Sequence, residues 1–408
     1  MKIAIINAVC GFGSTGKMAV SFYKTCLKNG HDAKIFYGME KEWNRKNPND
    51  DFYCFGNKLS LFFTRIFSYL FGRSGENALI STNKLLRKLK EYKPDAVWLY
   101  NIHGSFLNDG RLLNYLKKNC IQTVYNMIDE YAYLGKCCNS HDCTKYMDER
   151  GCNHCEYLKN SPSSLFIDNS HRRFKQKEKI YKDFDCLHFV SVQFVADKAK
   201  QSYLLKNREV IISDEFVDIS GVYYPRDTAD IKKELGIRDQ KVVLICADIT
   251  SPTKGVKYYL DAAKLCEKEN IVFIDVSFTG DTNQCPSNFI ALPYQTDVNK
   301  MAEIYSLADA YVCTSVSDTQ PNTCLEALGC GTPIIGFKIS GVPYVAPEGL
   351  GLFLDDISAA ALAEAIRNYS KKTEEMIDRC HKYALERFSA ESAEKRNLEI
   401  INMVKSLL

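Results

Sequence analysis

Two carboxylates in the stretch SVSDTQPNTCLEALGCGTP, residues 315–333, have types and spacing that call for a chemical explanation. Asp318 lies just ahead of Pro-Asn-Thr, and Glu326 follows eight residues later in a helical pattern that ends before Gly-Thr-Pro. The pattern predicts a strand, a loop, a helix, a tight turn and a second strand. One acid therefore lies in the loop and the other on the helix.

A lysine upstream of these acids stands where an anion would bind. Lys254 and Gly255 follow the apolar run KVVLICAD and precede a helical pattern. A cation at a helix N-terminus adds its charge to the backbone amides, and a diphosphate is the natural ligand. A lone surface lysine gives the same local pattern, so the surrounding motifs must decide.

A glycine-rich loop follows the first apolar run. The sequence GFGSTGK, residues 11–17, matches G-x-G-x-x-G, whose backbone approaches phosphate groups. The candidate ligand-binding residues of this loop are Gly13, Ser14, Thr15 and Gly16. Met18 stands where an ATPase needs a Mg²⁺-binding hydroxyl, which argues against an ATPase. A dinucleotide enzyme with Glu40 on a ribose remains an alternative.

The chain has 17 cysteines, and most of them lie singly in apolar runs, as expected of buried thiols in a reducing compartment. The exception is an insert at about residues 135–156, which contains five cysteines. Four of them predict a closed structural zinc site, namely Cys137, Cys143, Cys152 and Cys155. Free thiols and a redox pair are the alternatives.

Composition is that of an ordinary globular protein, with 46% hydrophobic and 25% charged residues among 408. Residues 1–215 carry 33 Lys and Arg against 23 Asp and Glu, and the remainder carries 20 against 27. The halves therefore have net charges of +10 and −7. A basic first half favours an anionic partner such as a phospholipid surface, a lipid diphosphate or a nucleic acid. A solvated basic face explains the charge equally well.

No segment reaches the length of a membrane span, and the N-terminal apolar run is too short for a secretory signal. The stretch LSLFFTRIFSYLF, residues 59–71, is interrupted by Arg65 and flanked by Lys58 and Arg73. It predicts an amphipathic helix on a membrane surface or, alternatively, a buried core helix with snorkelling cations.

Short β-branched runs alternate with helical patterns along the whole chain, which predicts parallel sheets covered by helices. Expected strands are KIAIINAV, DAKIFYG, DAVWLYN and IQTVYNMI, then KVVLICAD, IVFIDVSFTG, NFIALPY, DAYVCTS and TPIIGF. Expected helices include residues 84–92, 109–118, 256–269 and 299–306. We predict an α/β protein with two doubly wound, Rossmann-like domains at residues 1–215 and 216–388, and a helix at 389–408. Ligands should bind at the carboxyl ends of the strands, in the cleft between the domains.

The motif D-x-x-P-N-T-x-x-E-A-x-x-x-G-T-P-x-x-G, the Lys254-Gly255 loop and GSTG resemble the retaining glycosyltransferases of the GT-B fold, family 4. NIHGSFLN at residues 101–108, the cysteine insert and SPSSLFIDNS resemble the exopolysaccharide and colanic-acid type. The resemblance covers nearly the whole chain. It implies a C-terminal helix, containing FSAESAEKRNLEIINMV, that crosses back to the first domain.

The resemblance also implies a role for each site residue. Glu326 would hold the ribose of a sugar nucleotide, Asp318 the transferred sugar, and Lys254 the leaving diphosphate. Backbone amides of residues 319–323 would approach the donor, which brings in Thr319, Asn322 and Thr323. His103 would line the reacting sugar and Asp129 would orient the acceptor, so the expected catalytic residues are His103, Lys254 and Asp318.

The implied partners are a UDP- or GDP-sugar donor and a saccharide or lipid-linked acceptor, with no nucleic acid and no catalytic cofactor. We expect a cytoplasmic protein with peripheral contact at the inner face of the membrane. The chain departs from the family pattern at Asp318, usually Glu, at Tyr100 and Ile128, often His, and in the arginine-free loop ADITSPTKG. A non-catalytic binding relative and an NAD(P)-dependent enzyme are the alternatives.

Overall fold

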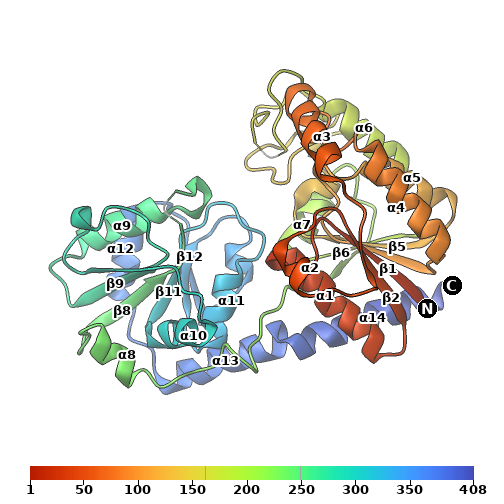
Figure 1. Ribbon diagram of the computed structural model, residues 1–408. Coiled ribbons are helices and arrows are strands. Elements are labelled where there is room, and N and C mark those ends of the chain that lie inside the picture. Colours follow the sequence, from red (N-terminus) through yellow and green to blue (C-terminus); the bar gives the residue numbers. More distant parts are fainter. Residues whose placement is uncertain (161, 249) are drawn as a thin grey trace. The chain divides into compact units, whose positions relative to one another are not determined.

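The computed structural model describes residues 1–160, 162–248 and 250–408 and shows two compact units (Figure 1). Unit 1 comprises Met1–Ser213 and Glu394–Leu408, and unit 2 comprises Asp214–Ala393. Two residues of the motifs quoted above lie outside the described residues: Ser161 of SPSSLFIDNS and Ile249 of ADITSPTKG.

Unit 1 is built on a seven-stranded parallel sheet in the order β3-β2-β1-β4-β5-β6-β7. Its strands are β1 Lys2–Asn7, β2 Asp32–Tyr37, β3 Phe52–Cys54, β4 Ala96–Leu99, β5 Gln122–Met127, β6 Leu187–Ser191 and β7 Val210–Ile212. Its helices are α1 Gly13–Lys28, α2 Glu42–Lys46, α3 Lys58–Phe71, α4 Leu79–Tyr92, α5 Asp109–Lys118, α6 Ser170–Tyr181 and α7 Gln193–Gln201, with 3-10 turns η1 Glu130–Ala132 and η2 Lys145–Met147.

The central strands of unit 1 are buried on both faces, which is why β1 reads as a nearly continuous apolar run. On one face, α1 packs Phe22 against Trp98 of β4, with ring centroids 4.9 Å apart. The same core includes Ile400, Ile401 and Val404 of α14 Ala390–Ser406, which begins in unit 2 and ends in unit 1. Helix α14 therefore completes the core of unit 1, beside α1 (Figure 1).

Unit 2 is built on a six-stranded parallel sheet in the order β10-β9-β8-β11-β12-β13. Its strands are β8 Lys241–Ile245, β9 Ile271–Val276, β10 Phe289–Leu292, β11 Ala310–Cys313, β12 Ile334–Phe337 and β13 Gly351–Leu354. Its helices are α8 Ala229–Glu234, α9 Val256–Leu265, α10 Val298–Leu307, α11 Asn322–Gly329, α12 Ala359–Asn368 and α13 Glu374–Phe388, with 3-10 turns η3 Pro252–Lys254, η4 Thr282–Gln284 and η5 Val342–Tyr344.

Helices cover both faces of the second sheet. Helices α9 and α12 share one apolar core with the strands, and α10, α11 and α13 share another. The predicted fold class is therefore confirmed: both units are doubly wound and Rossmann-like.

Helix α3 has the amphipathic character that the sequence predicts, but its apolar side chains are exposed. Phe62, Phe63 and Phe67 are 60%, 53% and 47% accessible, and the buried residues of this helix are Thr64 and Ser68. The alternative of a buried core helix is therefore wrong. In the part of the chain that the structure describes, no helix is both long enough and apolar enough to span a bilayer.

Candidate functional site

In unit 2, Lys254 and Asp318 are brought together by two neighbouring strands. Strands β8 and β11 are paired in parallel, so the loops that follow them leave the same edge of the sheet. Lys254 lies in the loop after β8 and Asp318 in the loop after β11. The Lys254 Nζ donates a hydrogen bond to Asp318 Oδ2 at 2.8 Å.

Backbone contacts hold these two loops against each other. Thr314 Oγ1 donates to the Lys254 carbonyl at 2.7 Å, and the Val316 amide donates to the Thr253 carbonyl at 2.9 Å. Gly255 has a left-handed conformation, with φ of 64°, and a Cβ there would lie 2.3 Å from the Thr314 carbonyl oxygen. This backbone conformation and close contact explain why glycine follows Lys254 in the sequence.

The Lys254 ammonium is stabilised in its charged form. Burial, the largest influence, lowers the pKa of Lys254, but the Asp318 carboxylate outweighs burial and the net pKa is raised. The lysine therefore carries a full positive charge at neutral pH. Its side chain is 39% exposed, so it is accessible to an anionic ligand.

A cavity of about 510 Å³ opens at this edge of the second sheet. Its polar lining includes Asp248, Ser251, Lys254, Thr279 and Thr323. Tyr294, 76% exposed, contributes an aromatic ring. A cation, hydroxyl groups and an aromatic ring around one hollow suit a phosphorylated ligand with a planar group.

Of the other residues predicted in unit 2, Thr323 lines this cavity, whereas Asp318, Thr319, Asn322 and Glu326 are not among its lining residues. Glu326 of α11 is half-buried and accepts a hydrogen bond from the Tyr305 hydroxyl at 2.8 Å. Thr319 follows Asp318, whose carbonyl accepts from Gly341 at 2.7 Å. Asn322 is the first residue of α11, and its Oδ1 is buried with no hydrogen-bond partner among the described residues.

In unit 1, His103 and Asp129 are brought together by the paired strands β4 and β5. His103 Nε2 lies 2.7 Å from Asp129 Oδ2, and Asp129 Oδ1 accepts from the Tyr131 amide at 2.9 Å. Both side chains are mostly covered, at 16% and 21% exposure. The sequence named each residue separately, and the structure shows that they form a pair.

A thiol that the sequence analysis left without a role completes this group. Cys138 Sγ lies 3.6 Å from His103 Nε2, and the ligand atoms of His103, Asp129 and Cys138 are within 4.8 Å of one another. Burial, the largest influence, lowers the pKa of His103, but Asp129 and Cys138 raise it well above its usual value. The imidazole is therefore cationic at neutral pH and held in one orientation.

A second cavity, of about 570 Å³, lies beside His103. Its lining includes Asn101, His103 and Ser105 after β4, and Arg65 and Tyr69 of α3. The sequence pattern predicts that α3 lies on a membrane or in the core, and it does not connect the helix with His103. Residues 65 and 103 are far apart in sequence, so no local pattern could have shown this contact.

The glycine loop forms the N-terminus of α1. Gly13, Ser14, Thr15 and Gly16 make up the first turn, and the Gly11 amide donates to the Gly16 carbonyl at 3.0 Å. Asn7 at the end of β1 donates to Thr15 Oγ1 at 3.3 Å and accepts from the Asn101 amide at 3.1 Å. The loop is thereby joined to the segment that leads to His103.

The four cysteines of the predicted zinc site all lie around one small cavity in the insert of unit 1. Cys137 and Cys155 have sulfur atoms 3.9 Å apart and are not bonded to each other. The structure therefore places the four predicted cysteines around the same cavity.

Residues 227–387 match the family of glycosyl transferases group 1. D-inositol 3-phosphate glycosyltransferase of Actinosynnema mirum is 24% identical over 201 residues, which are 42% of this chain and 48% of that protein. The chain spans about half or less of the length of the first curated relatives that it matches. WcaC of Escherichia coli K12, whose name provisionally assigns it to colanic acid biosynthesis as a glycosyl transferase, is 21% identical over 90% of this chain and 92% of its own.

Solved structures show the same fold over the whole chain. Anabaena HepE in complex with UDP superposes with a TM-score of 0.65 at 14% identity, with both chains covered in full. At this identity the likeness establishes the fold alone, which is the GT-B fold that the resemblance implied.

Proposed function

We propose that this chain is a retaining glycosyltransferase of bacterial surface polysaccharide biosynthesis, and the match of residues 227–387 to the glycosyl transferases group 1 supports this proposal. It moves a hexose from a nucleotide-diphosphate sugar to a saccharide or lipid-linked saccharide. The observation that carries this proposal is the Lys254–Asp318 pair at two neighbouring strand ends inside the matched segment.

The donor occupies the cavity of unit 2. Lys254 binds the diphosphate, Asp318 binds hydroxyl groups of the hexose, and Glu326 binds the ribose. The Lys254 ammonium has three N–H donors, and Asp318 accepts from one of them. The other donors can bind oxygens of the diphosphate. Support for a uridine nucleotide comes from Anabaena HepE, whose solved complexes hold UDP and UDP-glucose.

The chemistry assigned to this site needs neither a protein nucleophile nor a catalytic cofactor. The bond from C1 of the hexose to the diphosphate breaks, and the acceptor oxygen bonds to C1 on the same face. The departing phosphate oxygen takes the acceptor's proton. Lys254 stabilises charge on the diphosphate, and His103, fixed by Asp129, positions the reacting sugar.

Donor binding tests this proposal by calorimetry on the full chain with UDP-, GDP- and ADP-sugars. We expect one of these donors to bind, Glu326→Ala to abolish binding, and Glu364→Ala, an exposed acid of α12, to bind as the wild type does. Failure of every donor to bind the folded chain would contradict the proposal.

Measurements of donor hydrolysis and NADH binding distinguish a glycosyltransferase from a non-catalytic binding protein and from a dinucleotide enzyme. Slow donor hydrolysis in the absence of acceptor excludes a non-catalytic binding protein. Binding of NADH that is lost in Gly13→Ala would instead favour the dinucleotide enzyme. Gly13 has room for a Cβ but a φ of 66°, so this variant strains the loop without a steric clash.

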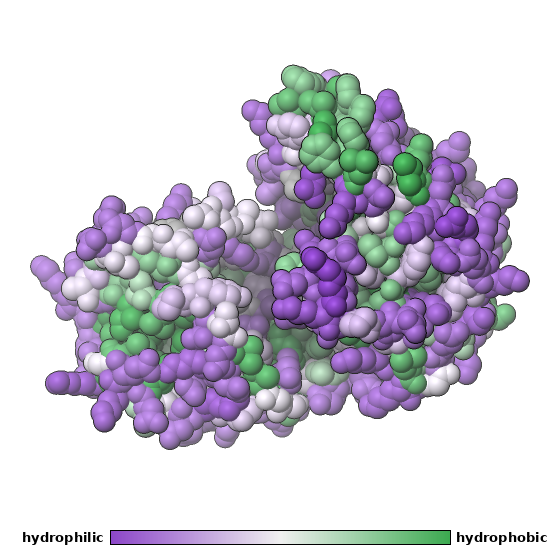
Figure 2. Space-filling model, in the orientation of Figure 1, coloured by the Kyte–Doolittle hydropathy of each residue, from purple (hydrophilic) through white to green (hydrophobic). Residues whose placement is uncertain are grey.

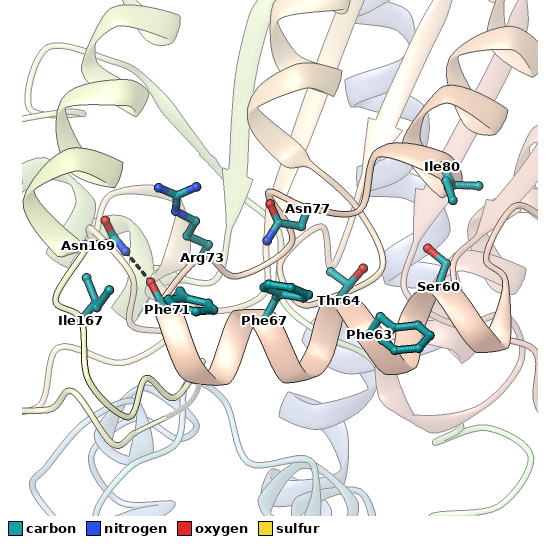
Figure 3. Close-up of a pocket in the computed structure, with 10 residues that line it drawn as sticks. All are labelled: Ser60, Phe63, Thr64, Phe67, Phe71, Arg73, Asn77, Ile80, Ile167 and Asn169. Atoms are coloured by element: carbon teal, nitrogen blue, oxygen red, sulfur yellow. Dashed lines mark hydrogen bonds between the residues drawn. The ribbon is translucent and has the colours of Figure 1, made fainter.

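A lipid-linked acceptor is favoured by the two different sides of α3. Arg65 and Tyr69 face the cavity that contains His103, whereas Phe63, Phe67 and Phe71 point along one side of α3 into a separate groove of about 660 Å³ (Figure 3). Arg65, His103 and Ser105 in the first cavity can bind a saccharide and its phosphate, and the three phenylalanine rings of the groove can contact a hydrocarbon chain.

The same helix forms the membrane contact of this proposal. Hydrophobic residues gather over α3 on the surface (Figure 2), and Phe166, 72% exposed, and Ile80, 68% exposed, extend the apolar area. Lys58 and Arg73, at the two ends of α3, are exposed beside these side chains and complement anionic headgroups. An amphipathic helix with aromatic side chains and flanking cations is suited to the interface of an anionic bilayer.

Vesicle sedimentation tests the membrane contact. We expect the chain to bind vesicles of phosphatidylcholine mixed with phosphatidylglycerol, and to bind less at high salt because headgroup attraction is screened. The double variant Phe63→Ser, Phe67→Ser should lose binding, and Leu265→Ser, an exposed apolar residue of α9, should keep it. Equal binding by the double variant and the wild type would rule out α3 as the contact.

A further inference from the structure

The cysteine insert is a long segment with little regular structure. Between η1, which ends at Ala132, and α6, which begins at Ser170, the described residues contain one 3-10 turn, η2. Loops of this length without secondary structure are uncommon in compact domains. Tyr133 and Tyr146 are fully buried, so the segment is nevertheless ordered around a small core. An additional constraint is needed to hold the rest.

Four thiols line one small hollow in this segment. The hollow has a volume of about 20 Å³, which is enough for one water-sized particle or one metal ion. Its lining includes Cys137, Cys143, Cys152 and Cys155. His141 and His154 are exposed and are not among its lining residues. Among the residue types that commonly bind zinc, cysteine alone lines this hollow.

One sulfur–sulfur distance in this group suits two thiolates bound to the same metal ion. The sulfur atoms of Cys137 and Cys155 are 3.9 Å apart. Two thiolates on a tetrahedral zinc ion, each with a bond of about 2.3 Å, are about 3.8 Å apart. The Gly135 amide donates a hydrogen bond to Cys152 Sγ at 3.1 Å, the kind of contact that orients a ligand sulfur.

We propose that these four thiols bind one structural zinc ion. Four thiolates and Zn²⁺ carry a net charge of −2. Lys136 lines the same hollow and offsets part of it, whereas Lys145, which also lines the hollow, pairs with Glu156 at 2.8 Å. Lys136 is 4% exposed and donates to the carbonyls of Leu158 and Asn160, which ties the site to the end of the insert. Among the described residues, no three of the four sulfurs lie within 4.8 Å of one another, so binding of one zinc ion requires the sulfurs to move closer together.

A second group of potential ligands lies nearby and must be distinguished from this one. His103, Asp129 and Cys138 have ligand atoms within 4.8 Å of one another. His103 and Asp129 already satisfy each other through a 2.7 Å hydrogen bond and belong to the proposed acceptor site. The zinc proposal does not depend on the proposed transferase activity, because metal content is measured without a substrate.

The test is the metal content of the full chain, purified without an affinity tag or chelator and measured by mass spectrometry. We expect one zinc per chain in the wild type and in Cys120→Ser, an exposed cysteine outside the insert. Cys155→Ser should lose the zinc, and His103→Gln should keep it. Zinc lost in His103→Gln and kept in Cys155→Ser, or no zinc in the wild type, would overturn the proposal.

Cobalt substitution keeps the proposal testable if Cys155→Ser fails to fold. The wild-type chain, stripped of metal and titrated with Co²⁺ without oxygen, should show the visible bands of tetrahedral cobalt and a thiolate charge-transfer band, both saturating at one equivalent. Octahedral cobalt without the thiolate band, or a Cys137–Cys155 disulfide in the purified chain, would contradict it.

Discussion

The Lys254–Asp318 ion pair is more informative about ligand binding than about stability. The lysine is 39% exposed and Asp318 is 18% exposed, and partly exposed pairs of this kind contribute little to folding. The ion pair positions the lysine, because the hydrogen-bonded loops after β8 and β11 hold the ammonium at a fixed place.

Replacing this lysine should slow transfer far more than it weakens folding. Lys254→Ala removes the charge that stabilises the leaving diphosphate in the proposed mechanism. We expect a loss comparable to removing one oxyanion-hole donor, about 2.7 to 4 kcal/mol of barrier, or about 10² to 10³ in kcat. Lys257→Ala, an exposed lysine in the first turn of α9, is the matched control. Donor hydrolysis rates measure the effect, and a Lys254→Ala rate equal to that of the control would contradict the role.

Asp275 makes the stability of unit 2 dependent on pH. It is fully buried in β9, and burial raises its pKa to about 8 against the partial opposition of the Ala247 amide. The folded state therefore holds a proton that the unfolded state releases near its usual pKa of about 4. From this group alone, stability is greatest below pH 4 and falls as the pH rises to about 8.

Asp275→Asn should remove this pH dependence. We expect the variant to lose less stability than the wild type between pH 6 and pH 9, because the amide does not ionise. Asp261→Asn, a 57% exposed side chain on α9, should keep the wild-type profile. Hydrogen exchange of unit 2 peptides in urea measures the stability of unit 2 at each pH. Identical dependence of this stability on pH in Asp275→Asn and the wild type would exclude Asp275 as its cause.

Single residues were predictable from sequence where a local motif contains them. Asp318, Glu326 and Lys254 lie in short patterns with fixed spacing, and so they could be named in advance. The contacts between motifs could not: the pairing of His103 with Asp129 depends on β4 lying beside β5. Cys138 joins them through a fold of the insert that no spacing rule describes.

Among the elements, the packing of α5 against α6 positions η1 and hence Asp129. Arg173 of α6 donates to both oxygens of Asp109 of α5, each at 2.7 Å, and to the Tyr131 hydroxyl of η1. Arg173 and Asp109 are each 3% exposed. Tyr131 also donates to Asp109 at 2.9 Å, so three elements share one buried polar network.

Breaking this network should destabilise unit 1. Arg173→Met leaves Asp109 buried without its cation, and such a loss costs about 3 to 5 kcal/mol. Arg172→Met removes a 48% exposed neighbour that pairs with Glu76 and should cost at most about 1 kcal/mol. Urea unfolding followed by tryptophan fluorescence measures both, since the two tryptophans, Trp43 and Trp98, lie in unit 1. Equal losses of unfolding free energy in Arg173→Met and Arg172→Met would show that the buried network does not stabilise unit 1 more than a surface ion pair does.

Periodicity predicted most of the elements, and it failed where strands are short or carry polar residues. Helix α5 has the predicted bounds, and nine strands were found within a few residues of their limits. The missed strands are β3, β6, β7 and β13. Three of these four, β3, β7 and β13, lie at sheet edges, and β3 and β7 have three residues each, too few for a pattern of alternation.

At the scale of the whole molecule, the chain returns to the unit in which it began. Helix α14 places Ile400, Ile401 and Val404 in the core of unit 1 with β1 and α1. Lys28 of α1 and Glu394 of α14 form an exposed ion pair at 2.8 Å. The sequence indicated this return only through its resemblance to a family, because an amphipathic pattern does not say which sheet it covers.

Truncating one of these side chains should weaken unit 1 selectively. Ile401→Ala removes a fully buried side chain and should lower the free energy of unfolding of unit 1 by about 2 to 5 kcal/mol. Asn402→Ala, an exposed neighbour, should have little effect. Tryptophan fluorescence reports unit 1, and hydrogen exchange reports unit 2. A loss of protection confined to unit 2 would contradict the placement of α14.

This return has a consequence for biosynthesis. Residues 214–393 are contiguous in the chain, so unit 2 can fold as soon as they have left the ribosomal exit tunnel. Synthesis of unit 1 starts earlier, but unit 1 cannot be completed until residues 394–408, its last part, have been translated. The usual vectorial order, in which the leading domain is finished first, is therefore reversed, and the nascent leading domain keeps an uncovered apolar surface until the trailing helix arrives.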